Sequence, residues 1–166
     1  AMSEALTIIL KRNDPSAVAK QVSLTELGSI KINKEERGKM LKAIPRNSVI
    51  GFLIGVLPGA GATIASFLAY GMERNFVSDE EKEKFGKGSV HGLTAPETAN
   101  NAACSGAFVP LLTLGIPGSG TTAVMLGALL GFGIQPGPRL YITNPEIFWS
   151  VIMSMYIGMV VLLILN

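Results

Sequence analysis

Residues 107–131 read AFVPLLTLGIPGSGTTAVMLGALLG. They form the centre of a 41-residue run, 98–138, that contains no Asp, Glu, Lys or Arg, and further charge-free runs cover 47–72 and 147–166. An apolar helix of roughly 20 residues crosses the hydrocarbon core of a bilayer, which is about 30 Å thick. The sequence therefore predicts an all-α, polytopic membrane protein that sits in a lipid bilayer.

The composition of the whole chain favours the same class. Of its 166 residues, 48% are apolar and 16% are charged, and the mean hydropathy is +0.42. A typical soluble domain carries roughly 25% charged residues. This composition excludes an ordinary soluble enzyme, a nucleic-acid binder and a disordered tail.

The ends of the sequence predict an internal fragment of a longer protein. Residues 1–10 are expected to be the end of a truncated transmembrane helix, and 144–166 a transmembrane helix that is also cut short. Between the apolar runs, 72–94 is expected to be a charged surface loop.

Residues 11–47 are expected to form a basic cytoplasmic connector. Lys11 to Arg46 contain nine basic and four acidic residues, and short loops rich in Lys and Arg stay on the cytoplasmic side. Five apolar residues of this segment would belong either to a short amphipathic element on the membrane surface or to a solvated loop: Val22, Leu24, Leu27, Ile30 and Ile32.

Two interruptions divide the apolar runs, and their sequences match. Leu57-Pro-Gly-Ala-Gly-Ala-Thr63 aligns with Ile116-Pro-Gly-Ser-Gly-Thr-Thr122 at an offset of 59 residues, with Pro, Gly, Gly and Thr identical. Proline blocks helix continuation, and glycine tolerates positive φ. We expect 48–71 to be either a re-entrant helical hairpin with arms of about ten residues or a single kinked span. Residues 95–138 are expected to form a discontinuous transmembrane helix.

The matched breaks predict a binding cavity. Unpaired backbone groups are costly in hydrocarbon, so broken helices occur there only where protein surrounds them or where they line a wet cavity. A helix that restarts after a break presents free amides and the positive end of its dipole, which attract an anion, and discontinuous helices bind ligands in secondary transporters. The alternative is that the small residues serve helix packing. The candidate substrate- or ion-binding residues in the breaks are Gly59, Gly61, Thr63, Gly118, Ser119, Gly120, Thr121 and Thr122.

The segment Ala95-Pro-Glu-Thr-Ala-Asn-Asn-Ala102 supplies three further candidates. Proline followed by an acidic residue predicts a helix start, so Glu97 either caps this helix or couples a proton. Asn100 and Asn101 lie in an apolar run, where their amides need partners. Because successive residues point to different faces of a helix, one is expected to bond a neighbouring backbone and the other to face a ligand or an ion.

Other chemical signals are set aside. Gly118-Ser-Gly-Thr-Thr-Ala123 fits a loose dinucleotide-binding pattern, but no acidic residue follows before Glu146 and the context is an apolar run rather than a βαβ unit. His91 is the only histidine in the sequence, so no pair of histidines is available to bind a metal ion. No histidine is positioned as a general base for a nucleophile, so we expect neither an enzyme nor a cofactor. The nucleophiles considered are Ser66, Ser105 and Cys104.

Four strings in this sequence are similar to a known family. Gly55–Gly71, Ala95–Ala102, Leu112–Thr122 and Gly131–Pro138 closely resemble the large membrane subunit of tripartite tricarboxylate transporters, the TctA family. The similarity covers nearly the whole chain from Pro45 onward.

The resemblance implies a multi-pass protein of the bacterial inner membrane, in an ion-driven importer of carboxylates such as citrate. It also implies two partners, a periplasmic solute-binding protein and a small membrane subunit. The coupling ion stays open: neutral oxygen atoms suit sodium, whereas Glu97 would carry a proton. The alternative functions are a passive channel, a membrane scaffold or a membrane-embedded enzyme.

Overall fold

The computed structural model describes residues 32–165, and these form helices and no strand. The all-α class predicted from the sequence is confirmed. The predictions for 1–10 and for most of the connector, with its surface element, lie outside the described residues. The helices are α3 (Lys34–Val56), α4 (Gly61–Phe76), α5 (Asp79–Lys82), α6 (Val90–Gly106), α7 (Phe108–Leu114), α8 (Gly120–Gly131), α9 (Leu140–Thr143) and α10 (Pro145–Leu165).

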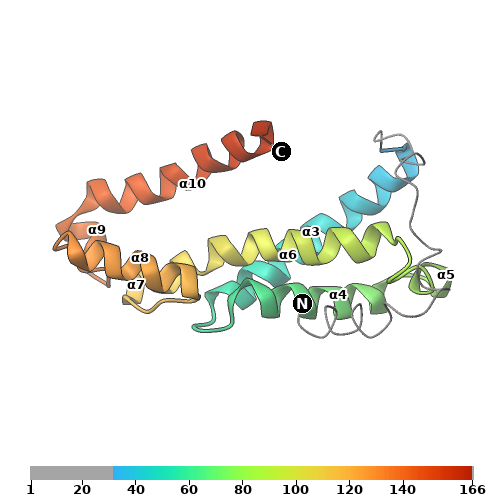
Figure 1. The fold of residues 1–166 in the computed structure, drawn as a ribbon, viewed down its shortest axis with the longest axis horizontal. Coiled ribbons are helices and arrows are strands. Elements are labelled where there is room, and N and C mark those ends of the chain that lie inside the picture. Colours follow the sequence, from blue (N-terminus) through green and yellow to red (C-terminus); the bar gives the residue numbers. More distant parts are fainter. Residues whose placement is uncertain (1–31, 166) are drawn as a thin grey trace, which may run out of the picture. The chain divides into compact units, whose positions relative to one another are not determined.

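Helices α3 and α4 form a hairpin. The chain turns at 57–60, and α4 returns beside α3 (Figure 1). Two glycines in the turn have positive φ, 81° at Gly59 and 68° at Gly61, which a side chain would disfavour. Re-entry of the chain into a bilayer at 48–71 stays a prediction, while the described residues there form a helical hairpin. Its arms are 23 and 16 residues long rather than about ten.

Helix α6 packs against both arms of this hairpin, and small residues let it approach closely. A Cβ atom on Gly55 would lie 2.6 Å from Cα of Ala103, and one on Gly51 would lie 2.5 Å from Cα of Ala99. The core between the helices is built from fully buried alanines: Ala65, Ala69, Ala99 and Ala103. Small residues four apart are typical of helix pairs that associate in membranes.

A buried charged cluster joins the three helices near the end of α4. The carboxylate of Glu73 on α4 is 0% exposed. It accepts hydrogen bonds from the Arg46 guanidinium (Nε at 3.0 Å), from Nδ2 of Asn47 at 2.8 Å and from Nδ1 of His91 at 2.7 Å. Because every partner is on α3 or α6, the cluster fixes the base of the hairpin to α6.

Removing the carboxylate of this cluster should destabilise the protein. Glu73→Ala leaves the half-buried Arg46 charge and the buried donors of Asn47 and His91 without their acceptor, which costs at least about 1–3 kcal/mol. The measurement is the unfolding temperature of the purified full-length protein in detergent, with the exposed Glu83→Ala as control. The double variant Arg46→Met with Glu73→Leu should recover most of the loss, and no recovery would contradict this account.

The structure corrects the predicted start of α3. The charge pattern predicts a connector over 11–47, but the described part of this range is helical from Lys34 onward. Acidic residues in the first turn favour this helix, and the pair Glu35–Lys39 at 2.6 Å supports it one turn later. Charge alone was therefore a poor indicator of a loop.

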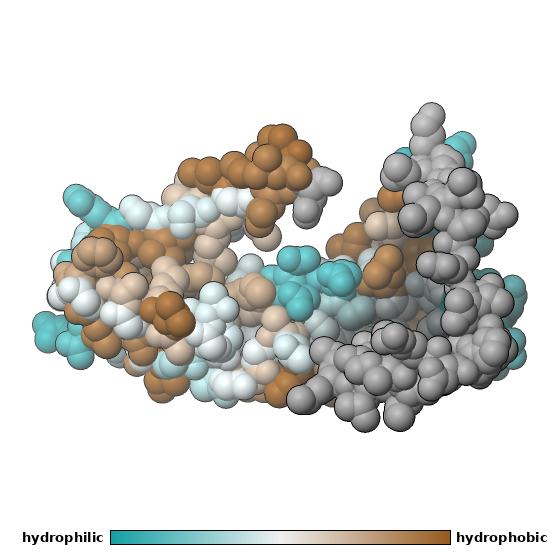
Figure 2. Space-filling model, in the orientation of Figure 1, coloured by the Kyte–Doolittle hydropathy of each residue, from teal (hydrophilic) through white to brown (hydrophobic). Residues whose placement is uncertain are grey.

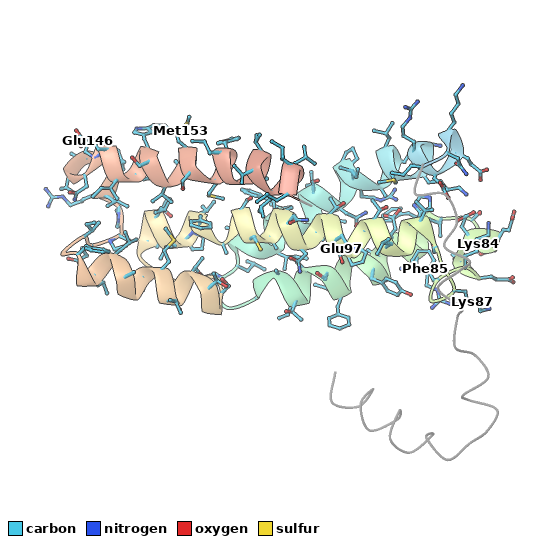
Figure 3. All side chains as sticks on the ribbon, turned by 45° about the horizontal axis from the view of Figure 1, so that its top comes forward. Lys84, Phe85, Lys87, Glu97, Glu146 and Met153 are labelled. Atoms are coloured by element: carbon cyan, nitrogen blue, oxygen red, sulfur yellow. The ribbon has the colours of Figure 1, made fainter. Side chains whose placement is uncertain are left out.

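The structure also corrects the start of α6. The helix begins at Val90, where the side chain of Ser89 accepts a hydrogen bond from the Gly92 amide as an N-cap. Pro96 therefore lies within the helix and does not begin it. The capping role considered for Glu97 is wrong, because this exposed residue lies beyond the first turn; Figure 3 shows it part-way along α6.

The second apolar region is discontinuous, as expected. Helix α7 ends at Leu114 and α8 begins at Gly120. The part of this region before Leu114 is itself interrupted at Ala107, where Pro110 has no amide to continue the bonding. The short helix α9 was not expected.

Helix α10 begins at Pro145, within the segment 144–166 that is expected to be helical. Its 21 residues make it the one described helix that is long and apolar enough to cross a membrane by length and composition. None of its residues is buried, and Figure 2 shows hydrophobic side chains over much of it.

Candidate functional site

The two matched breaks lie against one cavity of about 420 Å³, which we call the break cavity. Its floor comes from the end of α6 and the start of α7, through Ala103, Cys104, Ala107 and Phe108. Seven residues singled out from the sequence line it: Gly59, Gly61, Thr63, Ser119, Gly120, Thr121 and Thr122. Segments 59 residues apart in the sequence thus share one hollow.

The first break presents the uncapped start of α4 to this cavity. Ala60 occupies the N-cap position and provides no side-chain hydrogen bond. Among the described residues, the amides of Gly61, Ala62 and Thr63 have no hydrogen-bond acceptor. These amides, together with the helix dipole, form a polar wall suited to an anion.

The second break presents a capped start of α8. The side chain of Ser119 accepts from the Thr122 amide, and the Thr122 hydroxyl accepts from the Ser119 amide at 2.8 Å. This capping box satisfies two backbone donors. Within the described part of the chain, the amides of Gly120 and Thr121 still lack an acceptor. The first break has alanine where the second has serine, so only the second is capped by its own side chains.

The matching glycines of the two breaks differ in backbone conformation. Gly59 and Gly61 both have positive φ, whereas the second break places its left-handed residue earlier, at Gly115 (φ 72°), which ends α7. Gly118 is buried, and a Cβ there would lie 3.1 Å from Ala107. Gly118 therefore serves packing, as the alternative hypothesis expected for such residues, and it is absent from the lining of the break cavity.

Three predicted residues on α6 lie outside the break cavity. Asn101 is exposed and donates to the backbone oxygen of Glu97 at 3.0 Å. Asn100 donates to Oγ of Ser66 at 3.3 Å and lines a separate pocket of about 330 Å³. One asparagine thus bonds its own backbone and the other joins α6 to α4, while Glu97 lines neither cavity.

The break cavity offers polar groups without a basic side chain. Its lining contains no Lys, Arg or His, so an anion would meet amides, hydroxyl groups and helix dipoles. The residues of the floor were not singled out as binding residues, because nothing in a run of small apolar residues indicates which face meets a distant loop. In the described part of the chain, no group of His, Cys, Asp or Glu could hold a metal ion.

Comparison with known sequences establishes the family. The sequence matches the family described as "Tripartite tricarboxylate transporter TctA family" over residues 1–166. This chain belongs to the TctA family. The TctA family comprises membrane components of tricarboxylate transporters, which agrees with the resemblance found in the sequence.

Two relatives of this TctA-family chain come from Agrobacterium vitis. The first, "Uncharacterized 52.8 kDa protein in TAR-I ttuC' 3'region", is 39% identical over 155 residues, which are 93% of this chain and 30% of the relative. The second, "Uncharacterized protein in TAR-II ttuC' 3'region", is 47% identical over 116 residues, 70% of this chain and 47% of the relative. The chain thus spans less than half the length of each. No solved structure matches it.

Proposed function

We propose that this chain is part of the membrane subunit of an ion-coupled secondary transporter. The transporter imports tricarboxylates or related organic anions across the bacterial inner membrane, and the break cavity binds the anion. Membership of the TctA family supports the transport function. The hairpin of α3 and α4 would enter the membrane and leave it on the cytoplasmic side, with its turn near the bilayer midplane.

The observation that carries the binding proposal is the contrast between two groups of glycines. A Cβ on Gly51, Gly55 or Gly106 would collide with backbone of a neighbouring helix, so close packing requires these glycines. At Gly59 and Gly120 a Cβ would meet no atom within 4 Å, although both line the break cavity. Close packing therefore does not explain these two glycines; positive φ accounts for Gly59, and the open space at both positions leaves the neighbouring amides accessible to a ligand.

The positively charged groups that balance the charge of a tricarboxylate would come from other parts of the transporter. Neutral amides and hydroxyl groups orient an anion, but several negative charges require more compensation than two helix dipoles provide. The full-length subunit would supply a second part of the site. A periplasmic solute-binding protein would deliver the anion, a small membrane subunit would complete the complex, and a sodium or proton gradient would drive uptake.

Cys104 gives a direct test of occupancy, because it is exposed and lines the break cavity. Citrate should slow the alkylation of Cys104 by a maleimide at least about fivefold, since a bound anion occupies the space beside the thiol. Mass spectrometry of the peptide that contains Cys104, from the full-length complex in proteoliposomes, measures this rate.

The neighbouring residue provides the matched control. In a Cys104→Ser background, Ser105→Cys places a thiol in an apolar groove outside the break cavity, and citrate should leave its alkylation unchanged. Equal protection of both thiols, or of neither, would contradict the site. Uptake of labelled citrate separates the functions: a transporter accumulates it against its gradient, a channel only equilibrates it, and an enzyme changes it chemically.

A further inference from the structure

A second polar cavity lies at the base of the hairpin, at the opposite end of α4 from the break cavity. Its volume is about 450 Å³, and we call it the basic pocket. It is lined by residues 34–46 of α3, by the end of α4 with the connection to α5, by Glu81 of α5 and by His91 of α6. Four basic side chains, Lys34, Lys39, Lys42 and Arg46, line it, against two acidic ones, Glu35 and Glu81.

The acidic side chains of the basic pocket are neutralised by neighbouring lysines. Lys39 lies 2.6 Å from Glu35 and 3.1 Å from Glu81, and Lys84 lies 2.7 Å from Glu81. Hydrogen bonds from Lys84 and Lys39 hold the pKa of Glu81 below its usual range, so this carboxylate stays ionised and paired. Figure 3 shows Lys84 beside α5 at this end of the unit.

The remaining basic groups have unused donors. Within the described residues, Lys34 and Lys42 form no ion pair and no side-chain hydrogen bond. Arg46 gives Nε and one terminal nitrogen to Glu73, which leaves its second terminal nitrogen without an acceptor in that part of the chain. The pocket therefore holds an excess of positive charge with donors available to a phosphate.

The basic pocket lies where the charged part of α3 gives way to its apolar part. The charge-free run begins at Asn47, directly after Arg46, so the pocket lies at the boundary between the charged and apolar parts of the helix. Apolar side chains surround it: Phe76 lines the pocket and is 59% exposed, and Leu41 on the same stretch of α3 is 63% exposed. A headgroup could enter the pocket while its acyl chains cover these residues.

We propose that the basic pocket binds the phosphate of an anionic phospholipid headgroup. Basic pockets at the cytoplasmic ends of membrane helices bind such headgroups, and each Lys or Arg near the surface contributes to the attraction. The inference requires that the unit lies in a membrane, but it does not depend on the break cavity, because the two cavities share no lining residue.

The test uses the purified full-length subunit in a neutral detergent. Phosphatidylglycerol, phosphatidylcholine and inorganic phosphate are added separately, and binding is measured by the rise in unfolding temperature across a titration. We expect phosphatidylglycerol to bind at least about tenfold more tightly than phosphatidylcholine. The double variant Lys34→Gln with Lys42→Gln should lose that preference, whereas Lys34→Arg with Lys42→Arg should keep it.

A charge-matched control separates the pocket from general attraction. Arg74→Gln with Lys87→Gln removes the same two charges outside the pocket and should retain the preference within about twofold. Equal losses in the glutamine double variant and this control would overturn the proposal. An equal effect of inorganic phosphate, with no gain from the lipid, would assign the pocket to a soluble phosphate compound and overturn it as well. Citrate protection of Cys104 reports on the break cavity separately.

Discussion

Gly120→Phe is expected to reduce citrate uptake about 100-fold or more, equivalent to about 2.7 kcal/mol, without reducing the amount of protein in the membrane. Gly120 lines the break cavity, and a Cβ there meets no atom within 4 Å. The aromatic ring would therefore enter the cavity instead of colliding with a helix. It would occupy the space beside the free amides at the start of α8. The measurement is gradient-driven uptake by proteoliposomes that contain the full complex.

Gly127→Phe is the matched control for this variant. Gly127 lies on the same helix, is also exposed, and likewise has no atom within 4 Å of a built Cβ. It does not line the break cavity, so uptake should stay within about twofold of the wild-type rate. Uptake by Gly120→Phe at the wild-type rate would contradict a role of the break cavity in transport.

Gly55→Ala is expected to lower the unfolding temperature of the protein markedly. The new Cβ would lie 2.6 Å from Cα and 2.8 Å from the carbonyl carbon of Ala103, and both atoms belong to backbone that cannot rotate away. Helices α3 and α6 would have to separate, at the cost of overpacking, about 1–3 kcal/mol or more. Thermal unfolding of the detergent-solubilised subunit measures the loss, and its yield from membranes should fall in parallel.

Gly71→Ala supplies the opposite expectation. Gly71 lies within α4, and a Cβ there meets no atom within 4 Å. Alanine in the middle of a helix is more favourable than glycine by roughly 0.5–1 kcal/mol, so this variant should be as stable as the wild type or more so. Because helix propensity predicts a gain in both variants, a similar loss in both would contradict the assignment of the effect to the α3–α6 contact.

The positions of the breaks could be predicted closely from the sequence. Helix α4 begins at Gly61 and α8 begins at Gly120, and both starts lie within the matched interruptions at 57–63 and 116–122. Proline and glycine act locally, through a missing amide and through backbone freedom. Their effect is therefore visible without knowledge of the rest of the fold.

Helix boundaries in charged segments and the membership of the site depend on tertiary contacts. The dense charges of 11–47 favour a connector, but α3 begins among them, and Lys39 and Arg46 find acidic partners on other elements. Similarly, Asn100 and Gly118 resemble site residues in the sequence but contact neighbouring helices in the fold. The glycines that are identical in the two breaks also differ in backbone conformation: φ is positive at Gly59 and Gly61 but not at Gly118 and Gly120. Contacts with neighbouring segments determine φ at each of them.

The serine of one break and the alanine at the equivalent position of the other make the walls of the break cavity unequal. At the start of α8, the hydroxyl groups of Ser119 and Thr122 cap the helix whether or not a ligand is bound. The start of α4 has no side-chain cap, and among the described residues its first three amides, at 61–63, have no acceptor and are available to a ligand. The tip of the hairpin is thus the wall of the break cavity at which a bound anion would gain the most hydrogen bonds to the backbone.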